Sequence, residues 1–305
     1  MKTLLILMSL MSMGAATFAT SVVPVVLPRA EQLELHSVRT GDDFRILVAQ
    51  PETPPPVGGY PVVYVLDADL VFNSVVETMR IQSRRPQATG VLPALIVGIT
   101  YPEKDDAILR RAVDYTPTPL AASVSNSAPE MSAAMRTAGG GADRFLDFID
   151  HELRPLIAQR YATDASRQVL FGHSLGGLFV LHALFRRPQA FTHYIAASPS
   201  WWWNETVMAE QETAFRKLPD AARSGRSLLL TVGEFEQQPS RFSDNMPGGM
   251  ATLTRRAMVD NVRAVASRLK PLPGLRVDTL EIMGENHLSS LPQAINRGLR
   301  FALEP

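Results

Sequence analysis

The segment Gly172-His173-Ser174-Leu175-Gly176 fits the pattern G-x-S-x-G and stands between two patterns of regular structure. The run Arg167–Phe171 before it is apolar and prone to form a strand, and the segment Leu178–Phe185 after it carries large apolar residues at helical spacing. A serine in such a strand-to-helix turn exposes its hydroxyl at the edge of a sheet, beside the free N–H groups of the helix. Ser174 is therefore the predicted nucleophile of an acyl-transfer reaction.

A histidine is needed next, because a serine hydroxyl attacks at neutral pH only when a base removes its proton. With this kind of serine turn, the chain order is serine, acid, histidine, and three of the six histidines follow Ser174. His182 lies on the helix after the serine and His193 opens a strand, so both are interpreted as packed or surface residues. His287 lies in the polar loop 284–290, between the last strand and a closing helix. It is the predicted general base, and later the acid that protonates the leaving group.

The carboxylate that orients this histidine is expected after the preceding strand, Ser227–Val232. The loop there contains two acids, Glu234 and Glu236, and either could serve. Asp244 is a more distant option. The spacing alone therefore narrows the acid to two neighbouring glutamates without choosing between them.

Two backbone N–H groups are expected to stabilise the oxyanion that forms when an ester carbonyl is attacked. One is that of Leu175, directly after the nucleophile. The other is expected in the loop Asp67–Leu70, after the predicted strand Pro61–Leu66, and we assign it to Ala68.

Three adjacent tryptophans, Trp201-Trp202-Trp203, follow the predicted strand Tyr194–Ala197. We expect that three neighbouring indoles do not all point into one core. At least one is then expected to line an apolar pocket, and Trp201 and Trp202 are the predicted substrate-binding members.

The elements that must position these groups alternate along the chain. Two segments, Glu31–Val38 and Asp43–Ala49, flank a turn and predict an antiparallel hairpin. Apolar runs predict six further strands at Pro61–Leu66, Leu92–Ile99, Val169–Phe171, Tyr194–Ala197, Leu228–Val232 and Val277–Ile282. Helical patterns lie between them, including one over Phe145–Ile157 with a kink at Pro155 and one over Leu253–Leu269. The pattern predicts an α/β protein with a doubly wound, mainly parallel sheet and antiparallel N-terminal strands.

One region interrupts this alternation. From Tyr101 to Gly141 the chain is polar and rich in proline, serine and glycine. A connection of this length is expected to be a flap-like insertion over the site or a surface loop.

Composition restricts the remaining function classes. Thirty basic and thirty acidic side chains give no net charge, so nothing favours nucleic acid as a partner. The chain has no cysteine, which excludes disulfides and thiolate chemistry. No phosphate-loop or metal-ligand spacing is present, so we predict neither a cofactor nor a metal, and a small-molecule ester as the partner.

The first residues are typical of an export signal. Lys2 precedes an apolar run, Leu4–Met13, and small residues continue to Ala19. We expect cleavage after Ala19, with Ala16 as the alternative site, a single catalytic domain over 20–305 and a periplasmic or secreted location. No other stretch is long and apolar enough to predict insertion into a membrane.

Together these residues resemble the esterase branch of the α/β-hydrolase superfamily, and in particular its siderophore-esterase-like group. The similarity runs from about Glu31 to the C-terminus. It is carried by Tyr64-Val65-Leu66-Asp67, Arg111-Ala112-Val113-Asp114-Tyr115-Thr116-Pro117, Gly172-His173-Ser174-Leu175-Gly176-Gly177, Ser198-Pro199-Ser200-Trp201-Trp202, Val232-Gly233-Glu234-Phe235-Glu236 and Asn286-His287. The segment from Arg111 to Pro117 is the most discriminating, because the serine motif occurs throughout the superfamily.

The resemblance implies the α/β-hydrolase fold and a serine carboxylesterase that works through an acyl-serine intermediate. Its substrate would be a siderophore trilactone or a short-chain acyl ester. It also favours Glu236 as the acid and places Asp67 and Arg111 at the substrate site. The chain departs from the family at Ala68, where relatives commonly carry glycine. An acyltransferase on the same scaffold and a non-catalytic binding module are the alternative functions.

Overall fold

The computed structural model describes residues 23–103, 105–125, 131–240 and 248–304. In these residues a single sheet of eight strands runs in the order β1-β2-β4-β3-β5-β6-β7-β8. The strands are β1 Ala30–His36, β2 Asp43–Ala49, β3 Tyr60–Val65, β4 Leu95–Thr100, β5 Thr163–His173, β6 His193–Ala197, β7 Arg226–Gly233 and β8 Leu275–Ile282. β2 pairs antiparallel with β1 and with β4, and the other pairs are parallel. The expected mainly parallel sheet with antiparallel N-terminal strands is confirmed.

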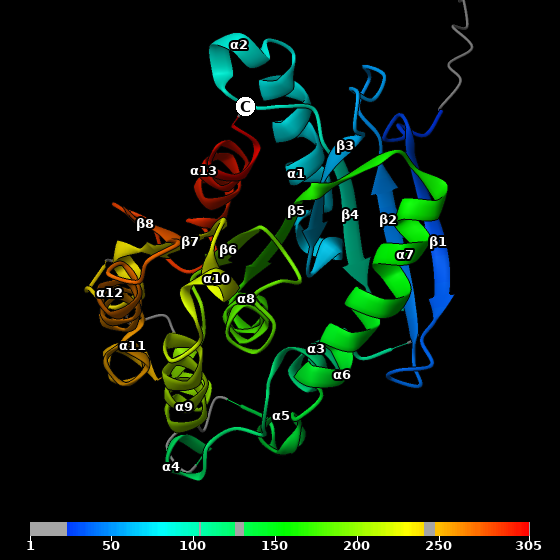
Figure 1. Ribbon diagram of the computed structural model, residues 1–305. Coiled ribbons are helices and arrows are strands. Elements are labelled where there is room, and N and C mark those ends of the chain that lie inside the picture. The colour runs from blue at the N-terminus through cyan, green and yellow to red at the C-terminus, as the bar shows by residue number, and fades with distance from the viewer. Residues whose placement is uncertain (1–22, 104, 126–130, 241–247, 305) are drawn as a thin grey trace, which may run out of the picture.

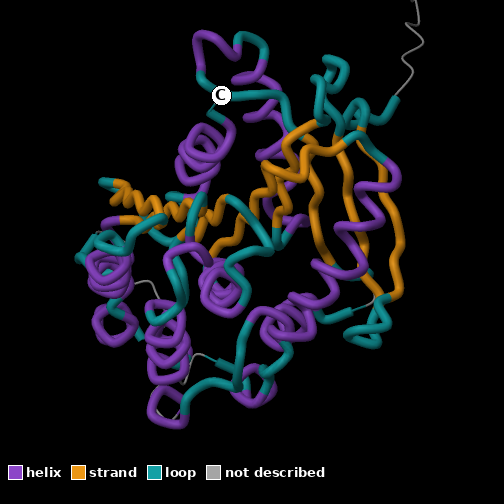
Figure 2. Tube along the Cα trace, viewed as in Figure 1, coloured by secondary structure: helices purple, strands orange, loops and turns teal. Residues whose placement is uncertain are grey.

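Helices cover both faces of the sheet, so that strands form its middle layer (Figures 1 and 2). One face packs against α1 and α13, and the other against a larger group that includes α3, α6, α7, α8 and α12. The helices are α1 Ala68–Ser83, α2 Pro86–Thr89, α3 Ala107–Tyr115, α4 Ala122–Ser125, α5 Ala133–Thr137, α6 Ala142–Phe148, α7 Arg154–Arg160, α8 Leu175–Arg186, α9 Glu205–Arg216, α10 Asp220–Arg223, α11 Gly249–Arg256, α12 Met258–Leu269 and α13 Leu291–Leu303. All residues of β3 and β4 are buried, which explains their nearly continuous apolar sequences.

The helix expected to kink at Pro155 is continuous but irregular. A π-helical turn, Ile149–Leu153, joins α6 to α7, and Pro155 lies in the first turn of α7. Proline has no N–H to donate to the preceding turn, and a π-helical turn is a common way to accommodate such a break. The irregularity therefore precedes the proline.

The expectation of one helix over Leu253–Leu269 is wrong. The structure has two helices there, α11 and α12, separated at Ala257, whose φ of 44° is left-handed. The apolar spacing continues across the break, because both helices pack against the same 3₁₀ turn, Trp201–Trp203. Periodicity alone gave no sign of the change in direction.

The insertion between Tyr101 and Gly141 is not a free flap in the part that the structure describes. It contains α3, which packs against α8, and the short helices α4 and α5. The indole N–H of Trp203 donates to the Thr118 carbonyl at 2.9 Å, and the Gly141 N–H donates to the Val113 carbonyl at 3.0 Å. The first contact ties the insertion to the segment after β6, and the second holds two parts of the insertion together.

Candidate active site

Two strand-to-helix junctions lie side by side at the carboxyl edge of the sheet. β3 leads through Asp67 into α1, and its neighbour β5 leads through Ser174 into α8. Asp67 has φ 53° and Ser174 has φ 60°, values that side-chain-bearing residues rarely adopt. Because helix N-termini have N–H groups without an intrahelical partner, Ala68 and Leu175 each offer a donor at this edge. The two residues predicted to stabilise the oxyanion therefore each begin the helix that follows one of two neighbouring strands, β3 and β5.

The serine turn is held closed by contacts that leave no room for side chains. A Cβ atom on Gly172 would lie 2.3 Å from the Gly176 carbonyl oxygen, and one on Gly177 would lie 2.7 Å from the Ala197 carbonyl oxygen. The Ser174 N–H also donates to the Ala197 carbonyl at 3.0 Å, which ties the turn to the end of β6. The flanking glycines are thus required by close backbone approach.

The acid and the base meet beyond the ends of β7 and β8. Glu236 ends a 3₁₀ turn, Glu234–Glu236, and its Oε2 lies 2.6 Å from Nδ1 of His287. Its Oε1 accepts hydrogen bonds from the Ser198 hydroxyl at 2.5 Å and from the Gly233 N–H at 2.7 Å. Burial raises the pKa of Glu236, but the His287 ring and these hydrogen bonds outweigh it and hold that pKa below its usual value. Glu236 is therefore a buried carboxylate aimed at an imidazole.

Glu234, the other candidate acid, turns to a different partner. Its Oε2 accepts a hydrogen bond from the Gly284 N–H at 2.8 Å, at the start of the loop that carries His287. Glu234 thus braces the backbone of the histidine loop while Glu236 contacts the ring. Asp244, the third option, lies outside the described residues.

Ser174 and His287 share two adjoining cavities, which we call together the cleft. No hydrogen bond joins their side chains in the described structure, and the Ser174 hydroxyl lies 3.4 Å from that of Ser200. A serine hydroxyl can rotate, and such catalytic bonds often tighten only around a substrate. One cavity, of about 360 Å³, is lined by Asp67 and Arg111, and the other, of about 300 Å³, by Trp202. We call them the aspartate lobe and the tryptophan lobe.

In the aspartate lobe, the Arg111 guanidinium forms an ion pair with the carboxylate of Asp67. Its Nε and Nη2 donate to the two carboxylate oxygens of Asp67, at 2.9 and 2.8 Å. The Tyr115 hydroxyl accepts a hydrogen bond from the Asp67 N–H at 3.2 Å. Both residues belong to the segment that best discriminates the family, and they hold the left-handed residue before Ala68. Asp67 and Arg111 thus lie at the site, where they form an ion pair with each other.

In the tryptophan lobe, only one of the three indoles reaches the cleft. Trp202 lines it, and the Arg256 guanidinium stacks over the Trp202 ring at 4.5 Å. Trp201 does not line either cavity; it packs against Phe185 and lies under the guanidinium of Arg268. All three tryptophans belong to one apolar cluster, so the expectation that they could not share a core is wrong. Adjacent large side chains share a core here because the short 3₁₀ turn Trp201–Trp203 points them in different directions within it.

Two contributors were not assigned from the sequence. Ser198 holds the Glu236 carboxylate, and its own φ of 45° turns the chain sharply after β6. Tyr115 holds the Asp67 backbone. Both stand in segments that follow or face the carboxyl edge of the sheet, which is the signal that could have found them.

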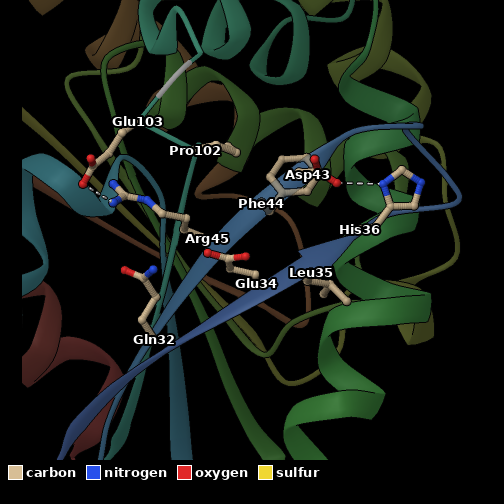
Figure 3. A pocket seen from close by; sticks show the side chains of 9 residues that line it. All are labelled: Gln32, Glu34, Leu35, His36, Asp43, Phe44, Arg45, Pro102 and Glu103. Atoms are coloured by element: carbon tan, nitrogen blue, oxygen red, sulfur yellow. Dashed lines mark hydrogen bonds and ion pairs between the residues drawn. The ribbon is translucent and has the colours of Figure 1, made fainter.

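A larger hollow of about 680 Å³ lies away from this chemistry, along β1 and β2 (Figure 3). It is lined by side chains that pair with one another, such as His36 with Asp43 and Arg45 with Glu103. No serine, threonine, tyrosine or lysine side chain lines it, so it offers no second serine-type site for ester attack.

The described residues contain no cluster of three or more histidine or carboxylate side chains that could hold a metal ion. Among the same residues, no helix is long and apolar enough to cross a membrane.

The junction at Ser174, on a doubly wound sheet and beside a carboxylate-bound histidine, defines a serine hydrolase of the α/β-hydrolase fold. Residues 37–268 match the family model Esterase, described as "Putative esterase", and the chain belongs to this family. It is an ester-hydrolysing enzyme, as its curated relatives are.

Two of those relatives match nearly their whole length. The chain is 39% identical over 281 residues to ferri-bacillibactin esterase BesA of Bacillus subtilis, covering 92% of this chain and 91% of the relative. It is 33% identical over 295 residues to the siderophore triacetylfusarinine C esterase of Aspergillus fumigatus, covering 92% and 95%. Among solved structures, the BES protein from Bacillus cereus has a TM-score of 0.78 at 33% identity, covering 93% of this chain and 98% of that one.

Proposed function

We propose that Ser174, His287 and Glu236 act as nucleophile, general base and orienting acid. His287 takes the Ser174 proton as the hydroxyl oxygen attacks the ester carbonyl, then gives it to the departing alkoxide. Water, deprotonated by the same imidazole, attacks the acyl-serine, and Ser174 leaves with the proton restored. The observation that carries this assignment is the 2.6 Å contact between Glu236 and His287 in the cleft that Ser174 lines.

The oxyanion of each tetrahedral intermediate would be held by the N–H groups of Ala68 and Leu175. They begin the helices that follow neighbouring strands β3 and β5, and the positive ends of both helices favour negative charge at this edge. Removal of one such donor costs about 3 kcal/mol of transition-state stabilisation in other hydrolases. Ala68 supports this role although relatives carry glycine, because its small side chain is buried and stays out of the cleft lining.

We propose siderophore esters as the substrates. Both curated relatives described above carry siderophore names and are matched over more than nine-tenths of their length. The cleft supports a substrate with bulky groups on both sides of the scissile bond, because Ser174 and His287 stand where two lobes meet. Trp202 offers a flat apolar surface for one such group.

The experiment is a hydrolysis panel with ferric and iron-free trilactone siderophores and with short-chain acyl esters. Wild type should cleave at least one trilactone with a kcat/KM well above that for the simple esters. Ser174→Ala and His287→Ala should both lower kcat by about 10⁶-fold and leave only residual catalysis, while His182→Ala and His193→Ala retain activity. Equal kcat/KM for trilactones and simple esters would overturn the substrate, and activity above this residual level in Ser174→Ala would overturn the mechanism.

We also propose that the chain is exported and cleaved after Ala19. Lys2 and the apolar run Leu4–Met13 support this, although residues 1–22 lie outside the described structure. Sequencing the N-terminus of the protein recovered from the producing cells tests the proposal. A mature chain that still begins at Met1 would contradict it.

A further inference from the structure

The residue before the nucleophile, His173, contacts the predicted base. Its Nε2 lies 2.8 Å from the backbone carbonyl oxygen of His287, and the two imidazole rings contact each other with centroids 4.5 Å apart and planes tilted by 41°. His173 is the last residue of β5, and His287 lies 114 positions further along the chain. A single side chain thus links the serine turn directly to the histidine loop.

The partner of Nε2 fixes the tautomer of His173. A carbonyl oxygen can only accept, so Nε2 must carry the proton and donate it. The Ser290 hydroxyl also donates to this carbonyl, at a longer 3.4 Å. His173 therefore makes the shorter of the two side-chain hydrogen bonds to the His287 carbonyl oxygen.

His173 is also suited to this place because it stays uncharged. It is 5% exposed, and burial together with the neighbouring His287 lowers the pKa of His173 to about 3. Arg111 acts in the same direction, whereas Glu236 and the hydrogen bond to His287 oppose it. Above that pH no positive charge stands against the His287 ring when it takes the serine proton.

We propose that His173 is a positioning residue for catalysis. Its Nε2–H and its ring fix the position of His287 relative to the Ser174 hydroxyl. The chain makes this link by placing the donor one residue before the nucleophile, so that the base is fixed relative to the same turn that fixes the hydroxyl. Glu236 restrains the far side of the ring, at Nδ1. His287 is thus held from two sides, by its ring nitrogen and by its backbone.

The inference rests on the proposed catalytic roles of Ser174 and His287, and the experiment separates the two. His173→Leu removes the donor and keeps an apolar side chain of similar bulk, and His173→Gln keeps a donor that can reach the same carbonyl. His173→Asn keeps an amide that is one carbon too short. His193→Leu, at the opposite end of neighbouring β6, is the matched control. Ser174→Ala and His287→Ala are measured in the same series.

We expect His173→Leu and His173→Asn to lower kcat by about 100-fold with little change in KM, since a displacement of about 1 Å can cost that much. His173→Gln should keep kcat within about fivefold of wild type, and His193→Leu should match wild type. In the His287→Ala background, His173→Leu should add no further loss, because it acts through the base that is already gone. Thermal unfolding of each variant checks that the measured protein is folded.

Three results would overturn the proposal. One is a folded His173→Leu with wild-type kcat; another is equal kcat in the Gln and Asn variants. The third is a full additional loss from His173→Leu in the His287→Ala background. If His173→Leu does not fold, the comparison of Gln with Asn decides alone. Activity above the residual level in Ser174→Ala or His287→Ala would instead refute the catalytic roles themselves.

Discussion

At the scale of single residues, the two glutamates after β7, Glu234 and Glu236, are only two positions apart but have different roles. Glu236 is buried and uses both oxygens, one on His287 and the other on Ser198 and Gly233. Glu234 is only partly buried and supports the loop through Gly284. Only the first arrangement can orient an imidazole and stabilise its protonated form.

We therefore expect Glu236→Gln to lower kcat by about 10³-fold or more, because an amide at this position favours the wrong tautomer of His287. The matched change Glu234→Gln should lower kcat by about tenfold or less, since an amide oxygen can still accept from the Gly284 N–H. Steady-state kinetics on one soluble ester measures both. Equal, small losses in the two variants would show that Glu236 is not the acid.

At the scale of elements, the turn between β5 and α8 depends on how closely backbones approach. Gly172 and Gly177 face backbone carbonyl oxygens, whereas Gly176 faces space that a methyl group fits: its Cβ would lie 3.4 Å from the Asp67 carboxylate. Gly176 is also helical, where glycine is less favourable than alanine by about 0.5–1 kcal/mol.

Gly172 and Gly176 should thus respond differently to substitution by alanine. Gly172→Ala should destabilise the protein by about 3 kcal/mol or more, because two backbone segments must separate. Gly176→Ala should stay within about 1 kcal/mol of wild type, since the helical gain offsets the tighter packing. Urea unfolding of wild type and of these two variants measures the difference. A Gly172→Ala variant as stable as Gly176→Ala would contradict the close approach seen in the turn.

The sequence predicted the strands well, but it did not predict the break between α11 and α12. Apolar runs predicted the six strands from β3 onward, most clearly β3 and β4, where burial on both faces leaves almost no polar positions. The two strands of the N-terminal hairpin were predicted from the turn between them instead. The apolar spacing over Leu253–Leu269 gave no sign of the break at Ala257. The left-handed Ala257 turns the chain between two helices, but the apolar residues on both sides keep a helical spacing. For the site, chain order identified Ser174 and His287 as candidates. The choice between Glu234 and Glu236 needed the path of a 3₁₀ turn, which spacing does not specify.

At the scale of the whole molecule, the insertion that carries α3 brings a carboxyl group into the interior. Asp114 is 3% exposed, and its Oδ2 has no hydrogen-bond partner among the described residues. The closest cation, Arg110, lies 3.8 Å away. Burial raises the pKa of Asp114 to about 7, and the Arg110 charge only partly opposes it.

This burial should make the stability of the entire fold depend on pH. The unfolded chain releases the Asp114 proton near its ordinary value of 3.8, whereas the native protein keeps it to about pH 7. Between these values the native state binds more protons, so the contribution of Asp114 to stability falls as pH rises and levels off above about 7. Asp114→Asn cannot ionise and escapes this loss.

Asp114→Asn should therefore gain stability over wild type as pH rises, with a larger gain at pH 8 than at pH 4.5. The upper limit is about 1.4 kcal/mol for each pH unit of the window. Urea unfolding of both proteins at the two pH values measures it, and Glu52→Gln, at an exposed loop position, is the control that should change little at either pH. A stability difference between Asp114→Asn and wild type that is the same at both pH values would mean that Asp114 is already ionised in the native protein. In that case Arg110, although it lies 3.8 Å away, would stabilise the ionised Asp114 carboxylate in the interior.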